Sequence, residues 1–187
     1  MTTPEVAGRL LTYEDLPDWE VDGLRHELIG GEHIAEPSPI PRHQVISGNL
    51  FHLLGTWIRE RRHGRLLTSP IDVVFSPTDV VGPDLLFIAR DRLDIIGAKY
   101  IDGAPDLAVE ILSPSSRRRD EVVKRRLYER EGVGEYWVVD PVRETVRVYR
   151  LVEGGYRRAD ELSAAAGDVL TSPLFPGLAI PLAEIFE

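Results

Sequence analysis

The chain contains no cysteine among its 187 residues. This absence excludes a disulfide framework, a metal site built from thiolates and a cysteine nucleophile. It also fits a reducing compartment, so we expect a cytoplasmic protein. No stretch approaches the roughly 20 apolar residues that a membrane-spanning helix needs. Residues 1–9 contain no apolar run, so we expect neither a signal peptide nor a membrane partner.

Basic residues are in the minority, with 22 Lys and Arg against 31 Asp and Glu and a net charge of −9. Because phosphate backbones prefer basic proteins, this balance argues at first against a nucleic-acid partner. The acidity is concentrated at the ends, however: residues 1–36 carry −7 and residues 151–187 carry −4, whereas residues 37–150 carry +2. Two arginine-rich clusters, at 59–65 and 117–130, lie in that central part. The net charge therefore does not exclude a phosphate substrate.

The remaining composition is that of an ordinary globular protein, with 43% apolar and 28% charged residues. We find no internal repeat and no low-complexity segment. The length predicts one domain over residues 1–187, with an N-terminal extension at 1–41, a core at 42–151 and a C-terminal extension at 152–187.

Hydrophobic spacing predicts an α/β (α+β) fold with a mixed β-sheet flanked by helices. Apolar residues at helical spacing predict a long helix from residue 43 to near 64 and a charged helix over 117–131. The Gly30-Gly31 pair predicts a hairpin between 25–29 and 33–35, and short helical turns are expected at 11–18 and 182–186. Strand-like runs occupy residues 66–68, 71–75, 85–89, 107–112, 136–139 and 145–151. The runs at 85–89 and 107–112 are almost wholly apolar, which is typical of central strands covered on both faces.

Two carboxylates occur at these central strands, one inside a strand and one directly before the other strand. Glu110 lies inside the run Leu107–Leu112, and carboxylates are almost never fully buried unless they are paired or bind a metal. Asp84 directly precedes the other run. Each has a simpler explanation, an ion pair with a nearby arginine for Glu110 and a Pro-Asp turn for Asp84. Together, carboxylates on neighbouring strands could converge on Mg²⁺, which prefers oxygen ligands.

Asp106 also follows a proline, but it lies four residues from Glu110 on the same predicted strand, or about 13 Å away. We therefore expect Asp106 to cap the strand start. Lys124 lies in the following helix, four residues after Asp120 and on the same helical face. It is either half of an exposed ion pair or a lysine that points at the metal site and stabilises developing charge there.

These residues, taken with several flanking motifs, resemble the Uma-two family of endonucleases. The motifs are Pro83-Asp84, Glu110, Ser113-Pro114-Ser115 with Asp120, Lys124 and Tyr128, His26–Gly31, Pro37-Ser38-Pro39 with His43, and Gly132-Val133 with Glu135–Pro141. The resemblance covers nearly the whole chain. It implies a fold of the restriction-endonuclease-like PD-(D/E)XK superfamily and Mg²⁺-dependent phosphodiester hydrolysis, with Mn²⁺ as a substitute.

The resemblance also assigns roles to individual residues. Asp84 matches the metal-binding aspartate, and Glu110 matches the acidic residue of the (D/E)XK element. Leu112 stands where the lysine of that element would be, so Lys124 is the candidate to replace it. Catalysis would then depend on Asp84, Glu110 and Lys124, with metal held by the two carboxylates.

Other matched residues have supporting roles in this interpretation. Glu27 could complete the acidic cluster, Asp120 accompanies Lys124, and His43 could position a water; a strand-edge charge for Glu27 and a capping residue for His43 are the alternatives. The run Arg117, Arg118 and Arg119 either belongs to a solvated loop or binds phosphates.

The function that we predict is a Mg²⁺-dependent endonuclease acting on nucleic acid, most simply DNA. Cleavage of both strands needs two active sites, so we expect a homodimer. The alternative is a catalytically inactive module on the same fold that binds nucleic acid or a protein partner, which the leucine at position 112 favours. Fold alone does not decide between them.

Overall fold

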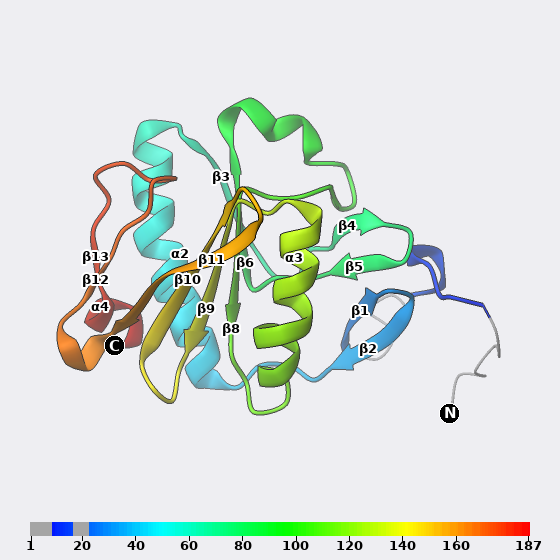
Figure 1. Ribbon diagram of the computed structural model, residues 1–187, viewed down its shortest axis with the longest axis horizontal. Coiled ribbons are helices and arrows are strands. Elements are labelled where there is room, and N and C mark those ends of the chain that lie inside the picture. Colours follow the sequence, from blue (N-terminus) through cyan, green and yellow to red (C-terminus); the bar gives the residue numbers. More distant parts are fainter. Residues whose placement is uncertain (1–8, 17–22) are drawn as a thin grey trace.

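A computed structural model describes residues 9–16 and 23–187. Its main sheet has six strands in the order β11-β10-β9-β8-β6-β3 (Figure 1). β8 and β9 are parallel and all other neighbours are antiparallel, so the sheet is mixed, as predicted. The bounds are β3 Gly64–Thr68, β6 Leu85–Ala89, β8 Leu107–Ile111, β9 Glu135–Asp140, β10 Thr145–Val152 and β11 Gly155–Ser163.

A second sheet has the order β2-β1-β5-β4-β7. β1 (Arg25–Ile29) and β2 (Glu32–Glu36) form the hairpin predicted from Gly30-Gly31, and both glycines have positive φ. β1 then pairs with β5 (Asp79–Val81), which is joined through β4 (Val73–Ser76) to β7 (Ile101–Asp102). A separate ribbon pairs β12 (Val169–Leu170) with β13 (Ile180–Pro181).

The long predicted helix is α2 (Pro41–Arg61), which begins with a proline in its first turn. It ends at Arg61, close to the predicted end near 64, and Arg62 caps it in the left-handed conformation (φ 51°). Gly64 instead begins β3, where the chain passes so close to β6 that a side-chain Cβ would collide with the Ile88 carbonyl.

The predicted helix after β8 contains a π-helical segment, η3 (Arg119–Lys124), followed by α3 (Arg125–Glu131). Gly132, with φ 84°, ends it, as helix C-caps commonly require. The described short helices are η1 (Tyr13–Asp15), η2 (Arg90–Ile95), η4 (Ala164–Ala166) and α4 (Leu182–Phe186). α4 matches the predicted turn at 182–186; the predicted turn at 11–18 is present as η1, and its residues 17 and 18 lie outside the described part.

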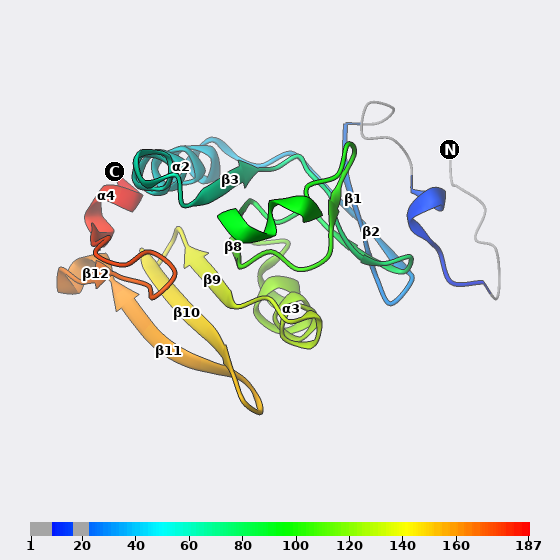
Figure 2. The same ribbon diagram turned by 90° about the horizontal axis from the view of Figure 1, so that it is seen from above.

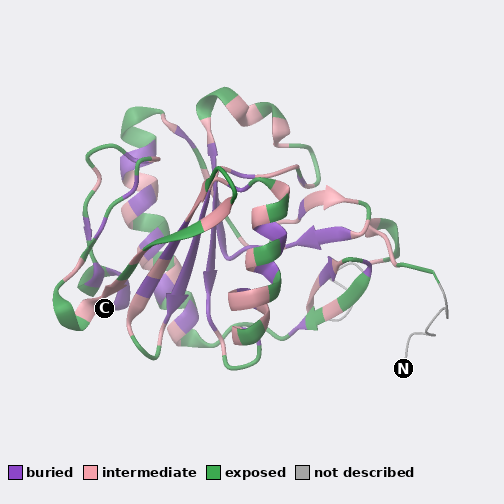
Figure 3. Ribbon diagram, in the orientation of Figure 1, coloured by how far each residue is buried: buried purple, intermediate pink, exposed green. Residues whose placement is uncertain are grey.

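Two apolar clusters cover the faces of the main sheet, with α2 on one side and α3 on the other (Figure 2). Leu85, Phe87 and Val109 pack toward α2, whereas Leu86, Ile88 and Ala108 pack toward α3. The central strands are accordingly buried on both faces, as their apolar character predicts (Figure 3). Among the described residues, no helix is long and apolar enough to cross a membrane.

Several strands were not predicted, and their sequences show why. β5, β7, β12 and β13 have only two or three residues, too few for a periodic pattern. β11 is nine residues long but lies at the sheet edge with mostly exposed or half-buried, charged side chains, so it lacks an apolar run. Strand β4 begins at Val73, two residues later than predicted.

Candidate active site

Asp84 and Glu110 meet where two adjacent strands of the main sheet lie side by side. β6 and β8 are antiparallel with Leu85 opposite Val109, and this register continues to Asp84 beside Glu110. The Ile111 main-chain N–H donates to Asp84 Oδ2 at 2.8 Å. Both carboxylates are buried, at 4% and 2% exposure. The sheet therefore brings together the two residues that the sequence singles out.

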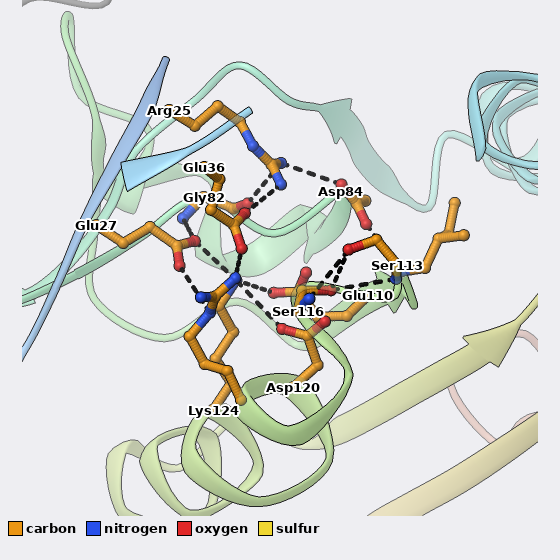
Figure 4. A network of polar contacts seen from close by, with 12 residues as sticks. Arg25, Glu27, Glu36, Gly82, Asp84, Glu110, Ser113, Ser116, Asp120 and Lys124 are labelled. Carbon is orange, nitrogen blue, oxygen red and sulfur yellow. Dashed lines mark hydrogen bonds and ion pairs between the residues drawn. The ribbon is translucent and has the colours of Figure 1, made fainter. Parts of the chain in front are cut away.

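Lys124 reaches this position from η3 and lies among three carboxylates (Figure 4). Its Nζ is 2.7 Å from Glu27 Oε1, 2.9 Å from Glu110 Oε1 and 3.8 Å from Asp120 Oδ1. Tyr128 Oη also donates to Glu110 Oε1, at 2.8 Å. Lys124 is fully buried, so it is not the exposed half of a surface pair.

The π-helical segment has contacts that fix its position. The Asp120 main-chain N–H donates to the Ser116 carbonyl at 3.0 Å, and the Tyr136 hydroxyl donates to the Asp120 carbonyl at 3.0 Å. Tyr136 lies in β9, so the central sheet contacts the π-helical segment at its second residue. Such turns occur often at functional sites. Here the segment carries both Asp120 and Lys124.

Asp84 has donors for both of its oxygens. Arg25 Nη1 contacts Oδ1 at 3.1 Å, while His43 Nε2 lies 3.0 Å from Oδ2, the oxygen that also accepts from Ile111. His43 is in the first turn of α2 and is 6% exposed. The structure thus places His43 next to Asp84 rather than at the surface.

The three consecutive arginines point to different places. Arg119 pairs with Glu36 Oε1, and its Nε lies 3.9 Å from Glu27 Oε2. Arg117 Nη1 pairs with Asp140 Oδ2 at 2.8 Å and with Glu121 at 3.3 Å, and Arg118 is exposed. Of the run, only Arg119 joins the carboxylate cluster.

Arg25 and Glu36 belong to the same cluster and were missed from the sequence. Arg25 Nη2 contacts Glu36 Oε2 at 2.7 Å, so Arg25 bridges Glu36 and Asp84. The signal was present: a hairpin turning at Gly30-Gly31 pairs Arg25 with Glu36 and puts Glu27 on the same face of β1 as Arg25. Tyr128, named above only as part of a matched motif, donates a hydrogen bond to Glu110.

Asp106 and Leu112 do not belong to the carboxylate cluster. Asp106 accepts from the Ala89 N–H at 2.7 Å and from Arg92 at 2.8 Å, at the opposite end of β8. Leu112, which stands in place of the superfamily lysine, is 4% exposed and packs in the apolar cluster beneath α3.

The environment drives the pKa values of the two central carboxyl groups in opposite directions. Burial alone would raise the pKa of Asp84, but the hydrogen bond from His43 and the charge of Arg25 hold it below its usual value. Burial raises the pKa of Glu110 well above its usual value, despite the neighbouring Lys124, and the nearby Asp120 and Asp84 carboxylates add to the rise. Burial likewise raises the pKa of Asp120.

Lys124 keeps its charge in this setting. Burial would lower the pKa of its ammonium group, but Glu110, Glu27 and Asp120 together raise that pKa above its usual value. The ammonium therefore acts as a fixed cation among carboxylates at neutral pH.

The carboxylates have the chemistry of a site for a hard cation. No group of three or more His, Asp or Glu side chains within 9–16 and 23–187 is arranged around a metal position. Lys124 and Arg25 contact oxygens of the cluster. Yet Glu27 Oε2 and Asp120 Oδ1 are buried without a hydrogen-bond donor. Buried oxygens of this kind call for a water or an ion, and carboxylate oxygens are the ligands Mg²⁺ prefers.

The net charge of the cluster leads to the same conclusion. The basic side chains of the cluster are those of Arg25, Arg119, Lys124 and His43. They contact five buried carboxyl groups, which are Glu27, Glu36, Asp84, Glu110 and Asp120. Buried charges are costly unless they are compensated. Carboxyl groups outnumber the basic side chains of the cluster, and a divalent cation would compensate them in their ionised form, so the residues present fit such a cation.

Comparisons with known proteins show the family and the fold of this chain. A family model described as "Uma2: Putative restriction endonuclease" matches residues 10–183. A crystal structure of "a putative nuclease belonging to DUF820 from Anabaena variabilis ATCC 29413" matches with a TM-score of 0.76 at 21% sequence identity, over 93% of this chain and 94% of that chain. At that identity the likeness shows a shared fold. No curated protein matches this chain.

Proposed function

This chain belongs to the Uma2 family, and from that premise we propose that it is a Mg²⁺-dependent endonuclease that hydrolyses phosphodiester bonds in DNA. The observation that carries the proposal is the buried contact of Lys124 with Glu110, beside Asp84 at the junction of two central strands. Acidic residues at such a junction, with an ammonium group beside them, are suited to phosphoryl chemistry.

Four carboxylates are the candidates to hold the metal: Asp84, Glu110, Glu27 and Asp120. When bound, a divalent cation would polarise a phosphoryl oxygen of the substrate and lower the pKa of a water bound to the cation. Mn²⁺ is expected to substitute for Mg²⁺, because both accept oxygen ligands. The two donor-free oxygens, on Glu27 and Asp120, support this assignment.

The remaining side chains would position these groups. Tyr128 and Lys124 orient Glu110 through one shared oxygen. His43 and Arg25 orient Asp84, one on each carboxylate oxygen. Lys124 is also the candidate to stabilise charge that develops on the phosphate and to orient the attacking water, the role that Leu112 cannot take.

The test is cleavage of single- and double-stranded DNA and RNA by the full chain, with Mg²⁺ and with Mn²⁺. Glu110→Gln and Asp84→Asn should each lower cleavage by more than the roughly 10- to 100-fold that loss of an outer-shell partner costs. Asp106→Asn is the matched control, because Asp106 is the carboxylate at the other end of β8. A folded preparation that binds neither metal and cleaves no substrate would disprove the proposal.

One observation favours a second candidate, an inactive module that binds nucleic acid or a protein partner. Both oxygens of Asp84 already have donors, from Arg25, His43 and Ile111. If this function is correct, Glu110→Gln will bind nucleic acid as strongly as the natural sequence, and neither will cleave it.

The proposal includes a homodimer, because cleavage of both strands of a duplex needs two sites. Sedimentation at several protein concentrations measures this directly. We also keep the proposals of one domain and of a cytoplasmic location, the latter from the lack of cysteine.

A further inference from the structure

A pocket of about 820 Å³ lies at the end of the main sheet away from the carboxylate cluster. The C-terminal half of α2, the start of β3 and the segment η2 form its walls, and these meet at the upper end of the sheet in Figure 1. His43, beside Asp84, and Arg59, in the pocket wall, are separated by 16 residues of α2, or about 24 Å of helix. The proposed nuclease function does not use this pocket.

Four arginines line the pocket: Arg59, Arg62, Arg65 and Arg90. All four are exposed. Within residues 9–16 and 23–187, no carboxylate forms an ion pair with any of them. The nearby Glu60 contacts Arg61 instead, at 3.4 Å. Guanidinium groups that line one pocket without an acidic partner can bind an anion, and their planar donors match phosphate oxygens.

The rest of the lining is mixed: His52 and Thr56 are polar, Gly55 and Gly64 have no side chain, and the other four residues are apolar. Ile58 (3% exposed) lies at the floor with the half-buried Leu66 and Leu93, and Phe51 (43% exposed) stands at the wall. A surface that binds only the phosphates of a duplex makes no use of apolar residues at the bottom of a pocket. A concave pocket of this size, largely apolar and with a few convergent charges, is typical of a small-molecule site.

We propose that this pocket binds a free nucleoside di- or triphosphate. The four guanidinium groups would take the phosphates, and Phe51 with the aliphatic floor would contact the base, since every base offers a face for stacking. Four cations match the charge of a nucleoside polyphosphate better than that of a monophosphate. The site is separate from the carboxylate cluster, so this proposal does not depend on nuclease activity.

The test is calorimetric titration of the full chain with ATP, GTP, CTP and UTP at one fixed salt concentration. The monophosphates, inorganic phosphate and a single-stranded oligonucleotide serve as comparison probes. At least one triphosphate should bind, and Arg65→Ala with Arg90→Ala should weaken its binding at least tenfold. Phe51→Ala should weaken triphosphate binding more than phosphate binding. Arg157→Ala is the matched control, because Arg157 is an exposed arginine on the distant strand β11.

Three results would overturn the proposal. Phosphate binding as tightly as the nucleotides would mean a general anion site. If the oligonucleotide bound and no free nucleotide did, the arginines would belong to a nucleic-acid-binding surface. Failure of every probe, or equal losses in Arg157→Ala and the pocket variants, would leave no specific site. Since the substituted side chains are exposed, the variants should fold, and circular dichroism checks this.

Discussion

The two ends of the main sheet use charge in opposite ways. At one end, five carboxylates are 5% exposed or less, and each contacts a basic side chain. At the other, four arginines are exposed and, in the described part of the chain, none pairs with a carboxylate. A charge that leaves water must be compensated within the protein, whereas an exposed charge keeps its hydration until a ligand replaces it.

This difference explains why the net charge of −9 says little about partners. Part of the negative charge is buried and contacts side-chain cations, so it repels a phosphate less than its count suggests. The exposed guanidinium groups, in contrast, remain available to anions. The location of each charge, which the fold determines, decides which partners the surface accepts.

The largest effect should come from removing the cation at the acidic end. Lys124→Met leaves Glu27, Glu110 and Asp120 without their shared ammonium, and breaking a buried ion pair on one side costs about 3–5 kcal/mol. Urea unfolding at pH 7 measures the loss. The chain has a second lysine, the exposed Lys99, and Lys99→Met should change stability by less than about 0.5 kcal/mol.

Equal stability of the two lysine variants would show that the acidic end does not depend on Lys124. A Lys124→Met protein that regains stability on addition of Mg²⁺ would instead support cation binding by the same carboxylates, because a ligand of the native state stabilises it.

At the basic end, the close contact of β3 with β6 can be tested in the same way. Gly64→Ala places a Cβ against the Ile88 carbonyl and the Phe87 ring, and overpacking of this kind costs about 1–3 kcal/mol. Gly48→Ala is the control, because Gly48 lies in α2 with open space around it and alanine favours helix by up to about 1 kcal/mol. The two substitutions should therefore shift the urea midpoint in opposite directions; a shift in the same direction contradicts the packing argument.

Asp140 adds a pH dependence next to the acidic end. Burial would raise the pKa of Asp140, but Arg117 and the N–H groups of Arg143 and Val142 lower it below the usual 3.8. A lowered native pKa stabilises the fold above the unfolded value, and this stabilisation is lost as the pH falls through the native pKa. Asp140→Asn should cost about 1–2 kcal/mol at pH 7 and less at pH 3, as measured by urea unfolding at both values. An equal cost at both pH values would show that charge is not the cause.

Much of the fold could be predicted because its signals are local. The apolar runs of β6 and β8 and the helical spacing of α2 each lie within one segment, and Gly30-Gly31 marks its own turn. The edge strand β11 and the two-residue strands could not be predicted, since their pairing partners, not their own sequences, define them.

The site was predictable to the extent that buried charge is conspicuous in sequence. Glu110 was identified because it interrupts an apolar strand. Arg25 and Glu36 were missed because each looks like an ordinary hairpin charge until the register pairs them and Arg25 contacts Asp84. The π-helical turn at Arg119–Lys124 leaves no mark in composition, and its contact with Tyr136 joins residues 16 positions apart.

The smallest change in the free energy of unfolding is expected for a substitution in the run Arg117, Arg118 and Arg119. Arg118 is exposed, so Arg118→Ala should alter unfolding by less than about 0.5 kcal/mol. If Arg118 contacts a phosphate of the substrate, the same variant will lower the salt slope of DNA binding by about one. Arg117→Ala should instead lose the stability that its ion pair with Asp140 provides and leave the salt slope unchanged. Fluorescence anisotropy at several salt concentrations measures the slopes, and a reduced slope in Arg117→Ala but not in Arg118→Ala would reverse the assignment. Arg119 already forms an ion pair with Glu36, which lowers its attraction for a new anionic ligand. The exposed Arg118 is therefore the arginine of this run best placed to bind a phosphate.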